Sequence, residues 1–192
     1  MPRRKKYDRK EVLDKAMYAF WNGGYNATSV RTLEEKMGIN QFSIYSSFKS
    51  KQGLFLESLN RYRTEVKEVY LKDMISSEGH VDDIRKFLYG FADAVKTGKT
   101  PNGCLMANTA MEIGSKDVDI SQQLKQFFQF LKEAFINVLN GAQSNAEIGR
   151  NVNIDSYANY LVGCTEGLAV IAKIMDDEQI SDFIDTTVNS LK

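Results

Sequence analysis

The chain has 192 residues, of which 43% are hydrophobic and 26% charged, with equal numbers of basic and acidic side chains. This is ordinary globular composition, and no apolar run approaches the ~18 residues that a membrane-spanning helix needs. Two cysteines in a chain of this length do not form a disulfide framework, so we expect a cytoplasmic protein without a membrane partner.

The charge is unevenly distributed along the chain. Residues 1–51 hold eleven Lys or Arg and five Asp or Glu, a net charge of +6, and the remaining 141 residues carry −6. A basic N-terminal part on an acidic body indicates that this part meets a polyanion. A solvated basic tail is the alternative interpretation, because the run Arg3 to Lys6 alone would produce one.

Helix caps and apolar spacing predict the first two helices. Asp8 is a suitable N-cap for a helix that ends at Gly23-Gly24. A second helix begins after Thr28 or Ser29 and ends before Gly38.

Two more helices follow after a short turn. Asn40 is the expected cap of a helix from Gln41 to about Phe48. Ser50 is the expected cap of a long helix that extends to about Ser76.

The remainder of the chain contains further helical stripes separated by polar breaks. Apolar residues recur at helical spacing from Val81 to Val95, and on both sides of the polar loop 141–153. No convincing alternation typical of strands appears between turn signals. The sequence therefore predicts an all-α protein of about nine helices, with a three-helix helix-turn-helix domain at 1–50 and a larger helical domain at 51–192.

The second and third helices meet in a turn typical of the helix-turn-helix motif. Gly38 can adopt a positive φ there without strain. Leu33 and Met37 on one helix face Ile44 and Phe48 on the next. The residues left mostly outward are Gln41, Phe42, Ser43, Tyr45, Ser46 and Ser47.

These outward side chains suit the major groove of duplex DNA. Gln41 can pair with adenine, Ser43 can bond to either base edge, and Phe42 can touch a thymine methyl group. A helix corner that packs only on itself is the alternative interpretation.

The run from Phe20 to Phe55 resembles the DNA-binding domain of the TetR family of transcriptional regulators. The matching residues are Phe20, Gly24-Tyr25, Thr28-Ser29-Val30, Gly38-Ile39, Ile44-Tyr45, Phe48, Lys51 and Leu54. The resemblance implies a homodimeric repressor that binds a palindromic operator in double-stranded DNA and is released by a small-molecule effector. It also implies DNA contacts from Thr28, Ser29, Arg31, Gln41, Phe42, Ser43, Tyr45, Ser46, Ser47 and Lys51.

Two residues depart from the usual pattern of the family. Phe42 stands where the family often has Gly or another small residue, which implies an altered base preference. Ser47 stands before Phe48, where His or Tyr is common. That difference affects one phosphate contact, although a serine hydroxyl can still donate a hydrogen bond.

The resemblance places the dimer interface on the last two long helices, 155–175 and 178–191. Their apolar stripes permit a four-helix interface across a two-fold axis. The same stripes complete the core of a single chain in the alternative interpretation. The expected dimer residues are Tyr157, Leu161, Cys164, Leu168, Ile171, Phe183 and Ile184.

An effector pocket is expected among the helices of residues 81–175. Because charge does not cluster there, we expect an apolar or aromatic ligand. Ordinary core packing is the alternative for each candidate residue. The candidates are Phe87, Phe91, Met106, Met111, Phe127, Phe128, Leu131 and Tyr160.

Cys104 suggests an alternative mode of regulation. It lies at an expected helix N-terminus, where the helix dipole favours a reactive thiolate. The stretch Gly103-Cys104-Leu105 also resembles a segment in a subset of the family, some of whose members sense electrophiles or oxidants through a cysteine. A redox-sensing repressor is therefore the alternative to ligand release, and simple packing of a buried thiol is the structural alternative.

Two other classes of protein fit the sequence less well. An enzyme needs converging catalytic or metal-binding side chains, and the chain has one histidine and no Glu-x-x-His pair. We therefore expect neither catalysis nor a cofactor. A helical adaptor would fit the fold, but it would not bind duplex DNA in a salt-dependent manner.

Overall fold

The computed structural model describes residues 7–114 and 116–191 of the chain. These residues form ten α-helices and one π-helical segment, and they contain no strand. The predicted all-α class is therefore confirmed. Two compact units can be distinguished: Met1–Thr64 with Leu105–Leu124, and Glu65–Cys104 with Lys125–Lys192.

Each unit combines segments that are distant in the sequence, which differs from the single division expected after residue 50. The first unit contains nearly all of α4 (Lys51–Glu65). The chain returns to this unit with α7 (Leu105–Ile113) and the beginning of α8 (Val118–Ser144). The division was expected near the start of the long helix that follows Ser50, and helical spacing does not reveal that a later segment returns to the first unit.

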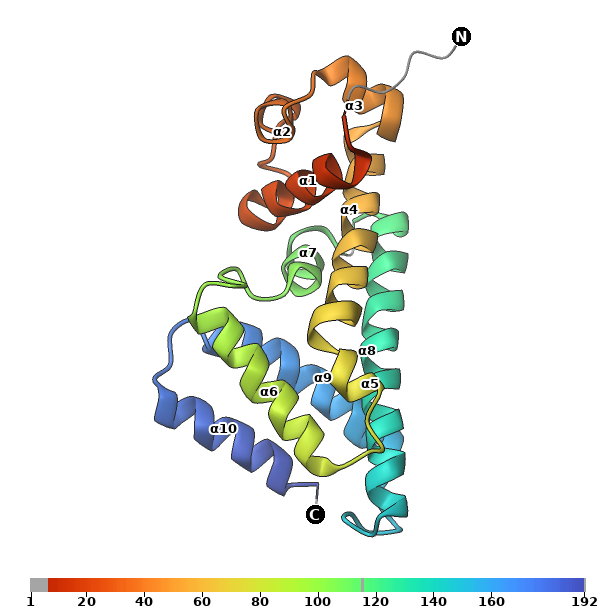
Figure 1. The fold of residues 1–192 in the computed structure, drawn as a ribbon, viewed down its shortest axis with the longest axis vertical. Coiled ribbons are helices and arrows are strands. Elements are labelled where there is room, and N and C mark those ends of the chain that lie inside the picture. The colour runs from red at the N-terminus through yellow and green to blue at the C-terminus, as the bar shows by residue number, and fades with distance from the viewer. Residues whose placement is uncertain (1–6, 115, 192) are drawn as a thin grey trace. The chain divides into compact units, whose positions relative to one another are not determined.

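Three short helices form the N-terminal part of the first unit: α1 (Arg9–Gly23), α2 (Val30–Met37) and α3 (Gln41–Phe48) (Figure 1). Asp8 caps α1 by accepting hydrogen bonds from two backbone amides, and Ser29 caps α2 by accepting one from the amide of Thr32. Gly38 ends α2 at φ 71°, the left-handed conformation that glycine adopts without Cβ strain. These helices begin and end as the capping residues predict.

Burial of one side of α3 determines how this helix lies on the first unit. Ile44 is fully buried and Phe48 is 2% exposed. Phe42, by contrast, is 81% exposed and Tyr45 is 37% exposed. Because residues three and four apart share a helix face, burying Ile44 and Phe48 turns the opposite face outward.

The long fourth helix of the prediction is interrupted. After α4 the backbone forms a π-helical turn, η1 (Val66–Tyr70), and then α5 (Lys72–Ile75). The amide of Leu71 donates to the carbonyl of Val66, five residues earlier, at 2.9 Å. A continuous helix was expected because Val66 and Val69 share helical spacing. The extra residue of the π turn instead leaves Val69 64% exposed and buries Leu71.

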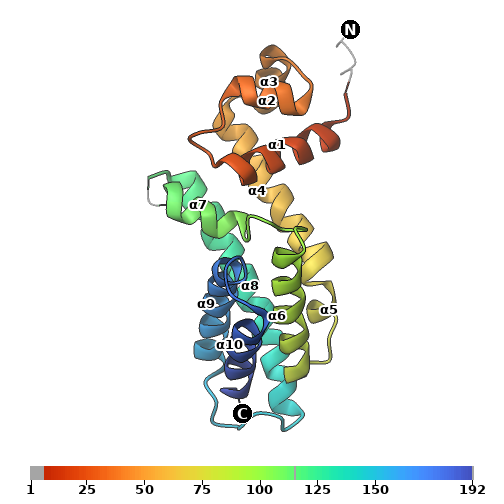
Figure 2. The same ribbon diagram turned by 90° about the vertical axis from the view of Figure 1, so that its left-hand side faces the viewer.

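The second unit contains α6 (Val81–Lys96), α9 (Ile154–Ile171) and α10 (Asp177–Asn189) packed side by side (Figures 1 and 2). Near the start of α6 the backbone passes very close to α8. A Cβ atom on Gly141 would lie 2.4 Å from the carbonyl oxygen of Glu78. Glycine is therefore required at this crossing. Among the described helices, none is both long and apolar enough to cross a membrane.

Two substitutions in α3 test this orientation. Ile44→Ala should lower the free energy of unfolding of the first unit by about 2–5 kcal/mol, because it removes a fully buried side chain. Phe42→Ala should change it by less than about 0.5 kcal/mol, because that ring is exposed. Urea unfolding followed by the fluorescence of the buried Trp21 measures both. Equal losses in the two variants would contradict the orientation.

Candidate functional site

The start of α3 is held by two side chains, Asn40 of the turn before it and Glu34 of α2. The Asn40 side chain accepts a hydrogen bond from the amide of Ser43 at 2.9 Å. The Glu34 carboxylate accepts one from the amide of Gln41 at 2.5 Å. These contacts occupy the backbone of the first turn and leave the Gln41 side chain and the Phe42 ring exposed. Base-reading side chains at the N-terminal end of such a helix suit a major groove.

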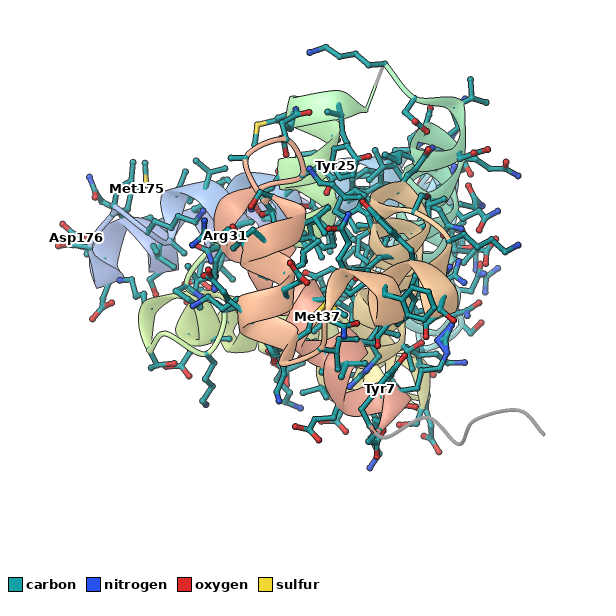
Figure 3. The ribbon with its side chains drawn as sticks, turned by 90° about the horizontal axis from the view of Figure 1, so that it is seen from above. Tyr7, Tyr25, Arg31, Met37, Met175 and Asp176 are labelled. Carbon is teal, nitrogen blue, oxygen red and sulfur yellow. The ribbon has the colours of Figure 1, made fainter. Side chains whose placement is uncertain are left out.

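Other exposed groups lie on α2 and α3. The Arg31 side chain, labelled in Figure 3, is 88% exposed and lies 3.3 Å from Glu35. Exposed ion pairs of this kind contribute about 0–1 kcal/mol, so Arg31 can exchange Glu35 for a phosphate at little cost. Ser29 and Ser46 are exposed as well, whereas Ser43 and Ser47 are half-buried.

The segment before α1 is attached to α3, which sequence reasoning did not foresee. The Tyr7 hydroxyl shares a hydrogen bond with the Ser47 hydroxyl and lies 3.4 Å from the carbonyl oxygen of Ser43. The Arg9 guanidinium lies 4.6 Å from the centre of the Phe48 ring. Because these contacts join residues about 40 positions apart, no local sequence pattern predicts them. The basic run Arg3 to Lys6 lies outside the described residues.

Lys51, expected to meet a phosphate, is half-buried at the start of α4. Its ammonium group lies 4.6 Å from the centre of the Tyr25 ring and 3.5 Å from the carbonyl oxygen of Asn26. Burial lowers the pKa of Lys51, and the nearby Glu112 carboxylate opposes that change. The surroundings therefore fix the position of this cation.

Thr28 differs from the expectation that it contacts DNA. Its side chain is 3% exposed, and its hydroxyl donates a hydrogen bond to the carbonyl oxygen of Gly24 at 2.6 Å. The hydroxyl thus closes the loop before α2. Ser29, not Thr28, caps α2, and the inward position of Thr28 removes it from the set of exposed contacts.

Two of the expected effector residues line a groove in the second unit. Phe87 and Phe91 lie nearly parallel, with ring centres 6.3 Å apart. They belong to a groove of about 350 Å³ between η1, α5 and α6, and Gly90 on α6 also lines it, with open space where a Cβ would lie. The full lining is Val69, Tyr70, Asp73, Met74, Asp83, Lys86, Phe87, Gly90, Phe91, Ala94 and Lys99.

The other expected effector residues do not line this groove. Met106, Phe127 and Leu131 are at most 2% exposed, Phe128 is half-buried, and Met111 and Tyr160 are exposed. Met106 and Met111 also belong to α7 in the first unit, whereas the groove belongs to the second. Helical periodicity does not distinguish a residue that lines a groove from one that fills a core.

The expected dimer residues divide into two groups. Leu161, Cys164, Leu168 and Ile184 are at most 8% exposed within the single chain, which removes them as direct contacts with a partner. Tyr157, Ile171 and Phe183 are half-buried. The apolar surface left on and just after α9 comes from Tyr160, Val170 and Ile174, which are 44%, 50% and 79% exposed.

Cys104 lies one residue before α7 and is 4% exposed. Its thiol is hydrogen-bonded to the carboxyl group of Glu166 on α9. Burial raises the pKa of Glu166 to about 7. Its Oε2 atom is buried and has no hydrogen-bond partner within the described part of the chain. A thiolate at Cys104 would lie beside this acidic group, so the surroundings do not favour a reactive thiol.

A metal centre finds no support in residues 7–114 and 116–191. No group of three or more His, Cys, Asp or Glu side chains in these ranges is arranged to hold an ion. The exposed polar face of α3 is therefore the surface whose chemistry is most distinctive.

Known proteins resemble the chain over almost its whole length. Residues 12–58 match the family model described as "Bacterial regulatory proteins, tetR family", and residues 81–188 match "Tetracyclin repressor-like, C-terminal domain". The HTH-type transcriptional repressor ComR of Escherichia coli (strain K12) is 28% identical over 172 residues, covering 89% of this chain and 82% of that protein. The uncharacterized HTH-type transcriptional regulator YezE of Bacillus subtilis (strain 168) is 27% identical, with both chains covered completely.

A solved structure has the same fold. It is a cysteine mutant of the TetR family transcriptional regulator CifR in complex with a 26-bp double-stranded operator DNA. The TM-score is 0.86 at 22% identity, over 99% of this chain and 100% of that one.

Proposed function

Because the chain belongs to the TetR family of DNA-binding transcriptional repressors, we propose that it is a homodimer that binds a palindromic operator through α3 and is released by a small apolar or aromatic effector. The family consists of regulators and not of enzymes. We therefore propose that a ligand of this protein acts as a signal and not as a substrate. We propose the cytoplasm, where DNA is accessible, as the location of the protein.

The exposed face of α3 carries this proposal. Gln41, Phe42 and Ser46 face outward on a short helix whose opposite face is buried. We assign base contacts to the first turn of α3, where a glutamine can pair with adenine and an aromatic ring can touch a thymine methyl group. Arg31, Tyr45 and Lys51 then contact phosphates, which set the position of the protein without reading sequence.

A dimer follows from the geometry of palindromic recognition. Two copies of α3 must enter successive major grooves about 34–36 Å apart, which one chain cannot do. We propose that the exposed side of α9 forms the interface, with Tyr160 and Val170 as apolar contacts and Ile174 just beyond the helix. Gly163 and Gly167 support this assignment, since a Cβ at either would meet no described atom within 4 Å and a partner helix can approach closely.

We propose the groove beside Phe87 and Phe91 as the effector site. Two parallel rings and the open position at Gly90 suit a planar apolar ligand. The ligand must bind the conformation that releases DNA more tightly than the one that binds it. A hundredfold loss of operator affinity requires about 2.7 kcal/mol of such preference.

Redox release through Cys104 is the second candidate mechanism. Its position directly before α7 favours it, because oxidation there would disturb the start of that helix. The burial of the thiol and its hydrogen bond to Glu166 oppose it. Loss of operator binding after mild peroxide treatment, absent in Cys104→Ser, would favour this mechanism over ligand release.

Selection of bound fragments from the source genome tests DNA recognition, followed by titration of a selected duplex. Arg31→Ala should weaken binding and reduce the slope of log K against log salt concentration by about 1, because one phosphate contact is lost. Lys67→Ala, which removes an exposed cation in the second unit, should leave affinity and slope nearly unchanged. Failure to enrich any duplex, or equal losses in both variants, would contradict the proposal.

The dimer is tested by sedimentation velocity. The wild-type chain should sediment as a dimer, and Val170→Asp should shift it toward monomer, because the new charge would be buried against the partner. Val69→Asp places the same charge on a side chain that is 64% exposed but lies on η1, and it should remain dimeric. A wild-type monomer, or a dimer that Val170→Asp does not weaken, would rule out this interface.

The groove is tested by filling it. A Cβ at Gly90 meets no described atom within 4 Å, so Gly90→Leu should fold normally and occupy part of the groove. In a panel of two- and three-ring planar aromatic compounds, those that release the wild-type chain from its selected duplex should not release this variant. Glu133→Leu, an exposed position on α8, is the control. Release that persists in Gly90→Leu would exclude the groove as the effector site.

A further inference from the structure

Glu112, near the end of α7, makes an unusual contact within the first unit. Its two carboxylate oxygens accept hydrogen bonds from the backbone amides of Tyr25 and Asn26, at 2.8 and 2.7 Å. Gly24 allows this approach, because a Cβ atom there would lie 2.9 Å from Oε2 of Glu112. The carboxylate therefore lies directly against the backbone of the loop between α1 and α2.

This loop is connected to both sets of proposed phosphate contacts. The Tyr25 ring packs against Phe55 with ring centres 4.7 Å apart, and the Lys51 ammonium lies over the Tyr25 ring, 4.6 Å from its centre. The carbonyl oxygen of Asn26 accepts a hydrogen bond from the same ammonium. The loop continues into Ser29 and the start of α2, where Arg31 lies. Its position therefore determines the positions of both cations.

A second contact nearby joins α4 to Asp117, the residue directly before α8. The Gln52 side chain on α4 donates a hydrogen bond to Asp117 at 2.8 Å, and Asp117 also accepts one from the amide of Ile120 at the start of α8. Burial and the Asp117 carboxylate both raise the pKa of Tyr25. Glu112 and Asp117 thus hold the loop and α4 at separate points.

We propose that Glu112 is a positioning residue for DNA binding, which fixes the α1–α2 loop and thereby Lys51 and Arg31 in the arrangement that meets phosphates. The inference rests on the proposed function and extends it to a residue far outside the helix-turn-helix motif. The charge of Glu112 alone would act against DNA, because an acidic group beside a phosphate-binding lysine weakens attraction to the duplex. Electrostatics and positioning therefore predict opposite signs when this charge is removed.

Two substitutions separate these effects. Glu112→Gln removes the charge and places an amide N–H₂ group against one of the two loop amides, so one acceptor is lost. Glu112→Asp keeps the charge but shortens the side chain by one methylene group, which withdraws the carboxylate from the loop. Both variants should bind the duplex selected by the wild-type chain about tenfold more weakly, the size of one lost charge-assisted hydrogen bond. The slope of log K against log salt should also decrease by about 1.

Asp119→Asn is the matched control. It removes one acidic charge from an exposed position in the first turn of α8, within the same unit. Its affinity for the duplex should equal that of the wild type or exceed it. Hydrogen exchange at the amides of Tyr25 and Asn26 should become faster in both Glu112 variants and stay unchanged in Asp119→Asn. Thermal unfolding of each variant ensures that binding is measured on folded protein.

The outcomes are distinguishable from failure of the proposed function. A wild-type chain that selects no duplex overturns the proposed function, and this inference with it. A wild-type chain that binds a duplex, with Glu112→Gln binding equally well or more tightly, overturns the positioning role alone. Unchanged exchange at Tyr25 and Asn26 in folded Glu112→Gln would also overturn it.

Discussion

The burial of Ile44 and Phe48 is the constraint on which the account depends. An eight-residue helix has too little surface to choose its orientation by propensity, so two fully or nearly fully buried side chains decide it. Their burial leaves an 81%-exposed phenylalanine beside polar side chains on the other face. Such a surface is costly to leave in water and well suited to base edges and thymine methyl groups.

Contacts from outside the motif then fix this helix and its surroundings. Tyr7, before α1, and Arg9, the first residue of α1, contact α3. Glu34 accepts a hydrogen bond from the first amide of α3. Glu112 holds the loop that precedes α2. Charged and hydrogen-bonding groups used in this way reduce the freedom that DNA binding would otherwise have to remove.

Local sequence patterns predicted the caps of α1, α2 and α3 because each depends on residues within a few positions, as at Ser29, Gly38 and Asn40. They did not predict the π-helical turn at Val66, after which Leu71 and not Val69 is buried. The inward hydroxyl of Thr28 was also missed, although its acceptor, the carbonyl oxygen of Gly24, is only four residues away. The contact of the Glu112 carboxylate was missed because its partners, Tyr25 and Asn26, are 87 and 86 residues away. The apolar stripe that contains Leu161 and Leu168 is compatible with a dimer interface and with the core of one chain. Only the burial of these two side chains shows that they belong to the core of one chain.

Photo-crosslinking tests the central claim most directly. Benzoylphenylalanine at position 42, in the place of an exposed ring on α3, should crosslink to bases of the duplex that the protein selects. The same residue at position 69, exposed on η1, should give no adduct with DNA. An adduct at 69 with none at 42 would contradict the account, because the outward face of α3 would then not be the surface that enters the groove.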